Sequence, residues 1–92
     1  MDEIFSDDFD MEIDPEQPLF IISIVSSMVS IPIWTLRKLD EMGVVEAERI
    51  GKKTRCYSKK QITQLKYIRF LMEEKHVNIS GIKIILEIEN KG

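Results

Sequence analysis

The chain has 92 residues and a mass of 10.8 kDa, with 13 basic and 16 acidic side chains and a formal net charge of −3. This length accommodates one small domain and disfavours an enzyme, because so small a core rarely supports a deep, preorganised pocket. The single cysteine, Cys56, excludes an internal disulfide, and the single histidine, His76, leaves no Cys/His set for structural zinc. We therefore expect a binding protein of the reducing cytoplasm that needs no cofactor.

The charge is distributed unevenly along the chain. Residues 1–17 hold eight acidic side chains and no basic one, whereas residues 18–92 hold 13 bases and 8 acids, a net +5. Residues 37–69 alone hold ten bases and four acids, a local +6. The sequence thus predicts an acidic disordered tail (1–17) followed by a basic folded domain (18–92), and the charge of that domain favours a polyanionic partner.

An uncharged stretch at the start of the domain, residues 18–36, approaches the length of a membrane span. On a helix, Ile24, Val25 and Met28 share one side while four serines share the opposite side. A polar side of this kind is unfavourable in contact with lipid. Pro32 would also fall inside such a span. The pattern therefore predicts two short helices joined by a turn, and no membrane segment.

The first of these helices is predicted from Ser23, as its N-cap, to Val29. A turn follows, and Pro32 is compatible with the start of a second helix, where a missing N–H is tolerated. This second helix continues to a stop at Gly43. The pair has the size and turn length of a helix-turn-helix, although many short helix pairs are only packing units.

A small hairpin is predicted directly after the helix pair. Residues 44–48 form the first strand, residues 49–53 a turn in which Gly51 stands beside two lysines, and residues 54–57 the returning strand. A hairpin with a cationic tip in this position is typical of a winged helix whose wing rests on a phosphate backbone. A solvated loop with lysines for solubility is the alternative.

The longest helix begins at a predicted capping box, in which Ser58 is the N-cap and Gln61 the third helical residue. It is predicted to end near Lys75, with His76 as a left-handed C-cap; a pH-sensing histidine is the alternative. Its apolar residues recur at helical spacing and form the expected core stripe: Ile62, Leu65, Ile68 and Met72.

A last helix is predicted for residues 79–90, with Asn78 as its cap. One apolar arc faces the core and contains Ile79, Ile82, Ile85 and Leu86. Ile84 and Ile88 lie roughly opposite, on a face too apolar to be left in water. This second face indicates contact with a partner; scattered surface isoleucines are the alternative.

Several motifs in chain order resemble the DNA-binding domain of MerR-family transcription regulators: SIVSSMVSIPIWTLRKLDEMGVV, a basic hairpin ending T-R-C-Y-S, and a helix opening K-K-Q-I. The family pattern is a first helix, then T-L-R-x-x-[DE]-x-x-G-[LV]-[LV], then a wing ending R-x-Y-S. The opening PLFIIS and the closing VNISGIKIILEIEN are most similar to heat-shock repressors of the HspR type. The resemblance covers residues 18–90 and implies a mainly α fold of four helices with a small β-hairpin wing, a winged helix-turn-helix.

The resemblance also implies a function: sequence-specific binding of double-stranded DNA, as a dimer on palindromic sites, to regulate transcription. The residues that would contact the DNA backbone are Arg37, Arg55 and Tyr57. At the wing tip, Lys52 and Lys53 match the family in charge and would add electrostatic contacts. The residues that would read bases from the second helix are Ile33, Trp34, Thr35 and Lys38.

Two departures from the family limit what can be transferred. Ile33 and Trp34 stand where polar base-contacting residues are usual, so the sequence preference of relatives does not carry over. Effector-sensing relatives continue into a dimerising helix and a ligand or metal module, whereas this chain stops at Gly92. We therefore expect a regulator without a C-terminal effector domain, which dimerises through Ile84 and Ile88 or relies on a partner protein.

An adaptor for protein interactions, built on a winged-helix frame, is the alternative function, with the acidic tail and the last helix as its partner surfaces. Burial of Trp34 against the first helix would favour DNA binding, and its exposure in an apolar patch would favour the adaptor. The tail itself is predicted to fold back over the basic face of the free protein and compete with DNA. A solvated tail that only aids solubility is the competing interpretation.

Overall fold

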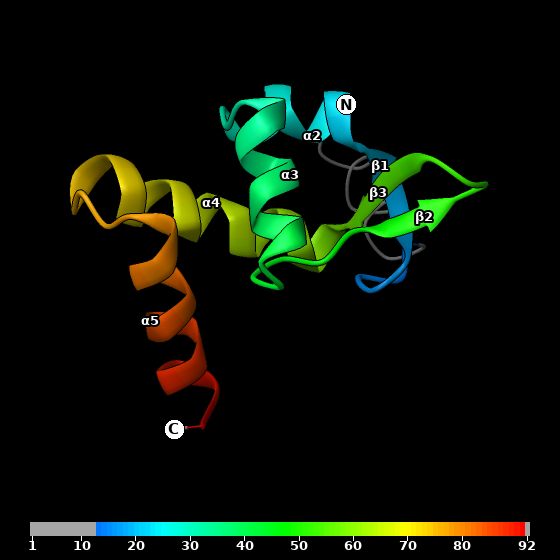
Figure 1. Ribbon diagram of the computed structural model, residues 1–92. Helices are drawn as coiled ribbons and strands as arrows, with labels where there is room; N and C mark the ends of the chain where they lie inside the picture. The colour runs from blue at the N-terminus through cyan, green and yellow to red at the C-terminus, as the bar shows by residue number, and fades with distance from the viewer. Residues whose placement is uncertain (1–12, 92) are drawn as a thin grey trace, which may run out of the picture.

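The computed structural model describes residues 13–91, which form four helices and a three-stranded antiparallel sheet (Figure 1). The predicted winged helix-turn-helix fold is confirmed. Of the predicted acidic tail, residues 1–12 lie outside the described residues. In chain order the elements are β1 (Pro18–Ile21), α2 (Ile22–Val29), α3 (Ile33–Glu41), β2 (Glu48–Ile50), β3 (Thr54–Ser58), α4 (Lys59–Glu74) and α5 (Ile79–Lys91).

Hydrogen bonds close the turn between α2 and α3. Ser30 adopts the left-handed backbone conformation, with φ 57°, at the end of α2. The hydroxyl of Ser26 donates to the carbonyl of Ile31, at 2.6 Å, and Pro32 is the N-cap of α3. The carbonyl of Pro32 accepts two N–H groups from the first turn of that helix. The predicted pair of short helices, with a proline at the start of the second, is therefore present.

The chain enters α2 directly from β1, a strand that the sequence did not indicate. Phe20 pairs with Tyr57 and Ile21 with Cys56 of β3, so β1 extends the sheet beyond the hairpin. The predicted N-cap at Ser23 is wrong, because α2 begins at Ile22 and its N-cap is Ile21, two residues before Ser23, without a side-chain hydrogen bond. Because β1 and α2 lie in one uninterrupted apolar run, neither the two-residue period of a strand nor the 3.6-residue period of a helix is distinct in this part of the sequence.

The wing is a shorter hairpin than predicted. Residues 44–47 are not a strand, because the N–H groups of Val44 and Val45 donate to the carbonyl of Leu39, at 2.9 and 3.3 Å. These bonds close the C-terminus of α3, where Gly43 has φ 74°. The ladder begins at Glu48 and pairs β2 with β3 on either side of the turn at residues 51–53. The predicted hairpin is present, but its first strand begins later and includes residues 49 and 50, which were predicted as part of the turn.

The N-terminus of α4 has the predicted capping box. The hydroxyl of Ser58 accepts the N–H of Gln61 at 3.1 Å, and the Gln61 side chain accepts the N–H of Ser58 at 3.0 Å. Leu71 is buried and Met72 is only partly buried, so the predicted core stripe ends one residue earlier than expected. Its other predicted members, Ile62, Leu65 and Ile68, are buried.

The connection from α4 to α5 also follows the sequence. Lys75, not His76, is the C-cap of α4, and His76 directly after it has φ 56°, the left-handed conformation predicted for this residue. The Asn78 side chain accepts the N–H of Gly81 at 2.8 Å and caps α5 as predicted. Ile82 and Leu86 are buried, and Figure 1 shows α5 leading away from the far end of α4.

The core lies where α2, α3, α4 and β3 meet. Its largest fully buried side chains are Tyr57, Leu36, Leu39, Leu65, Ile68, Ile82 and Val25. The uncharged stretch of residues 18–36 is divided among β1, α2, a turn and the start of α3. Within residues 13–91 every helix is too short or too polar to cross a membrane.

Candidate nucleic-acid interface

Helix α3 has a buried and an exposed side. Leu36 and Leu39 are fully buried, whereas Arg37 and Lys38 are exposed and the side chain of Trp34 is 74% exposed. Residues three and four positions apart lie on the same side of a helix, so Trp34 and the two cations share the outer side of α3. The first turn contains no acidic residue, which leaves the positive end of the helix dipole uncompensated. The outer side of α3 is therefore cationic, with one large apolar ring.

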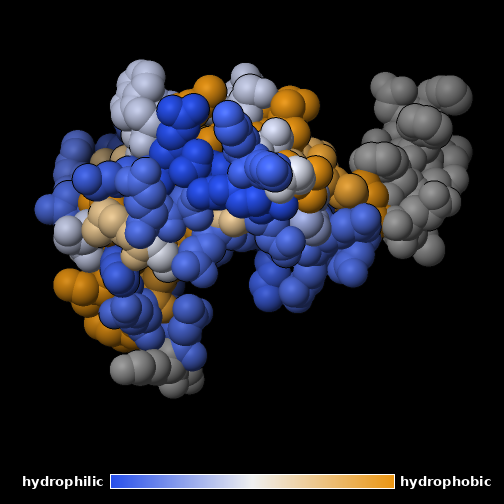
Figure 2. All heavy atoms as spheres, turned by 45° about the vertical axis from the view of Figure 1, so that its right-hand side comes forward, coloured by the Kyte–Doolittle hydropathy of each residue, from blue (hydrophilic) through white to orange (hydrophobic). Residues whose placement is uncertain are grey.

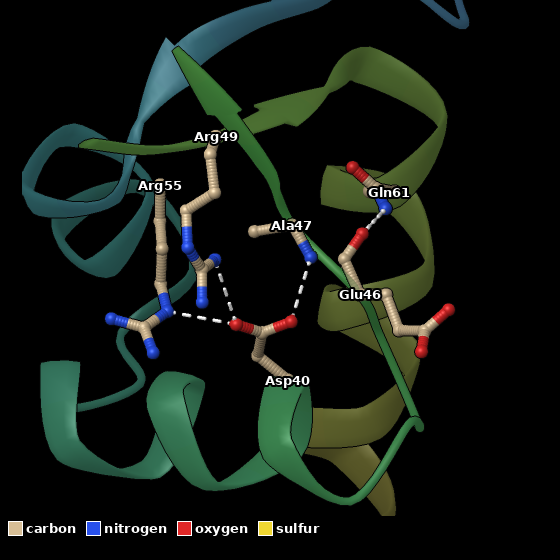
Figure 3. A network of polar contacts seen from close by, with 6 residues as sticks. All are labelled: Asp40, Glu46, Ala47, Arg49, Arg55 and Gln61. Atoms are coloured by element: carbon tan, nitrogen blue, oxygen red, sulfur yellow. Dashed lines mark hydrogen bonds and ion pairs between the residues drawn. The ribbon is translucent and has the colours of Figure 1, made fainter. Parts of the chain in front are cut away.

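Asp40, near the C-terminus of α3, holds the wing against this helix (Figure 3). Its Oδ2 accepts a hydrogen bond from the Nε of Arg55 at 2.8 Å and another from the Nη1 of Arg49 at 3.0 Å. Its Oδ1 accepts the backbone N–H of Ala47 at 3.1 Å. The three donors come from β2, β3 and the segment before them. One carboxylate thus fixes the orientation of the wing relative to α3.

The pairing register explains why this carboxylate is needed. Arg49 and Arg55 are directly opposite each other on β2 and β3, and two like charges in that relation repel. Burial of the Asp40 carboxyl opposes its ionisation, but the hydrogen bonds from Arg55, Arg49 and Ala47 prevail. The pKa of Asp40 is consequently below its usual value of 3.8, so the carboxylate is charged at neutral pH.

The tip of the wing carries free positive charge. Gly51 has φ 69°, a backbone conformation suited to the tight turn, and Lys52 and Lys53 beside it are exposed. Within residues 13–91 neither lysine has a side-chain hydrogen bond or ion pair, and the same holds for Arg37 and Lys38 on α3. Figure 2, in which the wing side is turned forward, shows hydrophilic residues gathered over the middle of this side of the molecule.

We use the name basic face for the cations that α3 and the wing carry: Arg37, Lys38, Arg49, Lys52, Lys53 and Arg55. Four of them are unpaired within the described chain, and the other two share one carboxylate. Such a surface attracts a polyanion over a distance set by the ionic strength. A protruding helix beside a cationic hairpin is also the shape that enters a groove of duplex DNA and rests on its backbone.

Residues 20–88 match the family described as MerR HTH family regulatory protein. The chain belongs to the MerR family. It is also 31% identical, over 80 residues, to the putative heat shock protein HspR of Streptomyces coelicolor. That alignment covers 87% of this chain and 53% of HspR, so the chain spans about half the length of this relative. The predicted MerR-family, HspR-like resemblance is confirmed, and this family consists of regulators.

The structure gives Tyr57 a different role from the one that the MerR resemblance implied. Tyr57 was expected to contact the DNA backbone, but its side chain is fully buried and its hydroxyl has no hydrogen-bond partner within residues 13–91. Burial also raises the pKa of Tyr57 to about 12, so the hydroxyl stays protonated. A buried hydroxyl is inaccessible to a phosphate group. We therefore assign Tyr57 to the core and exclude it from the interface.

A second wing residue of the MerR pattern, Arg55, has a divided role. Its Nε is held by Asp40 and its side chain is only 18% exposed. Figure 3 shows its two terminal nitrogens pointing away from Asp40. Arg55 therefore holds the wing to α3 and keeps two nitrogens for other contacts.

The residues of α3 that were expected to contact DNA differ in their exposure. On α3, Ile33 and Thr35 are half-buried, whereas Trp34, Arg37 and Lys38 are exposed. Trp34 is not buried against the first helix, so the condition set for DNA binding is not met, and its exposure meets part of the condition set for the adaptor hypothesis. However, its exposed neighbours one turn further along α3 are cations and not apolar residues.

Two functional residues, Asp40 and Arg49, were missed as site residues by the sequence interpretation. Asp40 occupies the acidic position of the motif T-L-R-x-x-[DE], but the motif alone does not indicate what this acidic residue does. Arg49 and Arg55 are each three positions from Lys52 along the chain. A hairpin whose turn is centred on Lys52 therefore places the two arginines opposite each other. Two opposed arginines require a carboxylate nearby, and this is the signal in the sequence that indicates the network.

Proposed function

We propose that this MerR-family chain is an HspR-like transcription regulator that binds double-stranded DNA with sequence specificity. The observation that carries the proposal is the basic face, whose unpaired cations lie on the two elements that contact DNA in winged helices. In this mode α3 enters the major groove and the wing tip lies along a phosphate backbone. Phosphate contacts would supply most of the affinity, and the exposed residues of α3 would supply the selectivity.

Arg37 supplies a direct test, because it is exposed and has no ion pair among the described residues. Replacing it in Arg37→Ala is expected to weaken duplex binding about tenfold, since one charge-assisted hydrogen bond to phosphate is lost. The loss should be similar for every duplex sequence, because a phosphate contact carries no base information. Fluorescence anisotropy with several labelled duplexes measures both effects.

The matched control for Arg37→Ala is Lys75→Ala. Lys75 is exposed and is the C-cap of α4, whose C-terminal end lies away from the wing in Figure 1. The substitution removes the same charge as Arg37→Ala does. Loss of Lys75 should change affinity much less than the loss of Arg37. Equal effects of the two substitutions would mean that only net charge matters, and would contradict a binding site on α3.

We also propose that the outer face of α5 binds a second copy of this chain. Ile84 and Ile88 are 56% and 65% exposed, one turn apart, while the opposite side of α5 packs on the core. The Tyr67 hydroxyl donates to Glu89 at 2.8 Å and helps to hold α5 on α4. A second copy is the occupant favoured by the family resemblance, because a two-fold dimer matches the palindromic sites it implies.

The double variant Ile84→Ser/Ile88→Ser is expected to convert the dimer to a monomer, because both apolar contacts are lost from the α5 face. Sedimentation equilibrium gives the mass directly. Ile24→Ser removes a similarly exposed isoleucine from α2 and should leave the dimer intact. A wild-type protein that sediments as a monomer at micromolar concentration, alone and with DNA, would contradict the proposed dimer.

An adaptor for protein interactions is the second candidate, and the exposure of Trp34 favours it. The two functions separate in a selection of duplexes from a random library. A regulator enriches a defined sequence, whereas an adaptor enriches none. A failure to enrich any duplex, together with binding that does not respond to Arg37→Ala, would support the adaptor.

A further inference from the structure

Trp34 has the largest exposed fraction of the large apolar side chains described, 74%. It lies in the first turn of α3, the end of the helix whose dipole attracts phosphate, and no acidic residue accompanies it there. An indole ring left in water is unfavourable, and it gains free energy when a partner covers it. Because Trp34 lies on the outer side of α3, the partner that covers its ring is the molecule that α3 binds.

The chemistry of the major groove restricts what a tryptophan can contact. Base pairs present hydrogen-bond donors and acceptors there, and the one apolar group among them is the C5-methyl of thymine. The indole ring has a single donor and no acceptor, so it cannot form the bidentate bonds that distinguish guanine or adenine. The sequence of α3, IWTLRKLDE, also contains no Asn or Gln for adenine. A single hydrogen bond from the indole N–H would not distinguish guanine, adenine and thymine, which all present acceptors, so an apolar contact is the base-discriminating interaction open to Trp34.

We propose that Trp34 is a specificity-determining residue that recognises the C5-methyl group of thymine in the major groove. This inference rests on the proposed function, because it requires α3 to enter that groove. Lys38 lies one turn further along the same side of α3, where it would contact the flanking phosphate and add affinity without discriminating between bases. The preferred half-site consequently carries thymine where the first turn of α3 meets the bases.

Two pairs of duplexes test this inference, each differing only in the C5-methyl group. The first pair is alternating dA-dT and dA-dU, and the second is alternating dG-dC with 5-methylcytosine or with cytosine. The full-length wild-type protein should bind the methylated member of each pair about fourfold more tightly for each methyl group that Trp34 covers. Anisotropy titrations at one low salt concentration provide the four affinities.

Three variants assign the methyl preference to the indole ring. Trp34→Ala should bind both members of each pair equally, and Trp34→Phe should keep most of the preference because it keeps an aromatic ring. Lys38→Ala should weaken binding to all four duplexes and leave the ratio within each pair unchanged. Both positions, Trp34 and Lys38, are exposed at the surface of α3, and unchanged thermal unfolding confirms that the variants fold.

The outcomes separate this inference from the proposed function. A wild-type protein that binds in a salt-dependent manner but ignores the methyl group overturns the inference and leaves the DNA-binding function standing. A methyl preference that persists in Trp34→Ala also overturns it, because the preference then arises from the shape of the duplex. Absence of salt-dependent binding to all four duplexes overturns the proposed function, and the inference with it.

Discussion

Raising the salt concentration from about 50 mM to about 200 mM is expected to weaken duplex binding between about a hundredfold and about a thousandfold for each protomer in contact with the duplex. Each phosphate that a cation neutralises releases counterions, and the logarithm of the affinity falls by about 0.9 per decade of salt for each one. The smaller effect is expected if only the four unpaired cations of the basic face act. The larger effect is expected if Arg49 and Arg55 act as well.

The slope of a salt titration therefore counts the contacts made by the basic face. Lys52→Ala/Lys53→Ala should reduce the slope by about two phosphate equivalents, since both lysines are exposed and unpaired among the described residues. Lys75→Ala should leave the slope unchanged. Affinity that does not depend on salt in the wild-type protein would contradict DNA binding through this face.

Asp40→Ala is expected to lower the free energy of unfolding by about 2 to 3 kcal/mol. The side chain of Asp40 is only 9% exposed, and it accepts three hydrogen bonds, two of them from charged groups. Its removal leaves Arg49 and Arg55 opposite each other without a counterion. Denaturant titration followed by circular dichroism measures the change.

The exposed Glu41, next to Asp40 on α3, offers a matched control. It has no ion pair or side-chain hydrogen bond within residues 13–91, so Glu41→Gln should change the free energy of unfolding by less than about 0.5 kcal/mol. Asp40→Asn removes the charge at nearly constant volume. Its effect should lie between those of Glu41→Gln and Asp40→Ala, because the amide oxygen can still accept one bond.

The depressed pKa of Asp40 predicts a pH dependence of this stabilisation. A carboxyl whose pKa is lower in the folded than in the unfolded protein stabilises the fold above about pH 4, and the stabilisation is lost as the pH falls through the folded pKa. The stability difference between wild type and Asp40→Asn should therefore be full at pH 7 and shrink progressively below about pH 4. A difference of the same size at pH 7 and pH 3 would show that ionisation of Asp40 is not its source.

Local patterns in the sequence predicted most elements, because their causes lie within a few residues. The capping box at Ser58 and the cap Asn78 follow from side chains that bond backbone groups three residues away, and the left-handed residue His76 lies where the helix ends. The strand β1 escaped prediction because its hydrogen bonds go to β3, more than 30 residues later in the chain. Val44 and Val45 suggested a strand by composition, but the C-terminus of α3 uses their N–H groups.

The separation of charge, the helix-turn-helix with its wing, and the family could all be predicted from the sequence, since these depend on composition and on short-range spacing. Which cations are available to a ligand became clear from the packing of the fold. It paired Arg49 and Arg55 with Asp40, buried Tyr57 in the core and left Trp34 and four cations exposed. The physical reason is that charge is a property of each residue, whereas exposure and pairing depend on segments far apart in the chain that packing brings together.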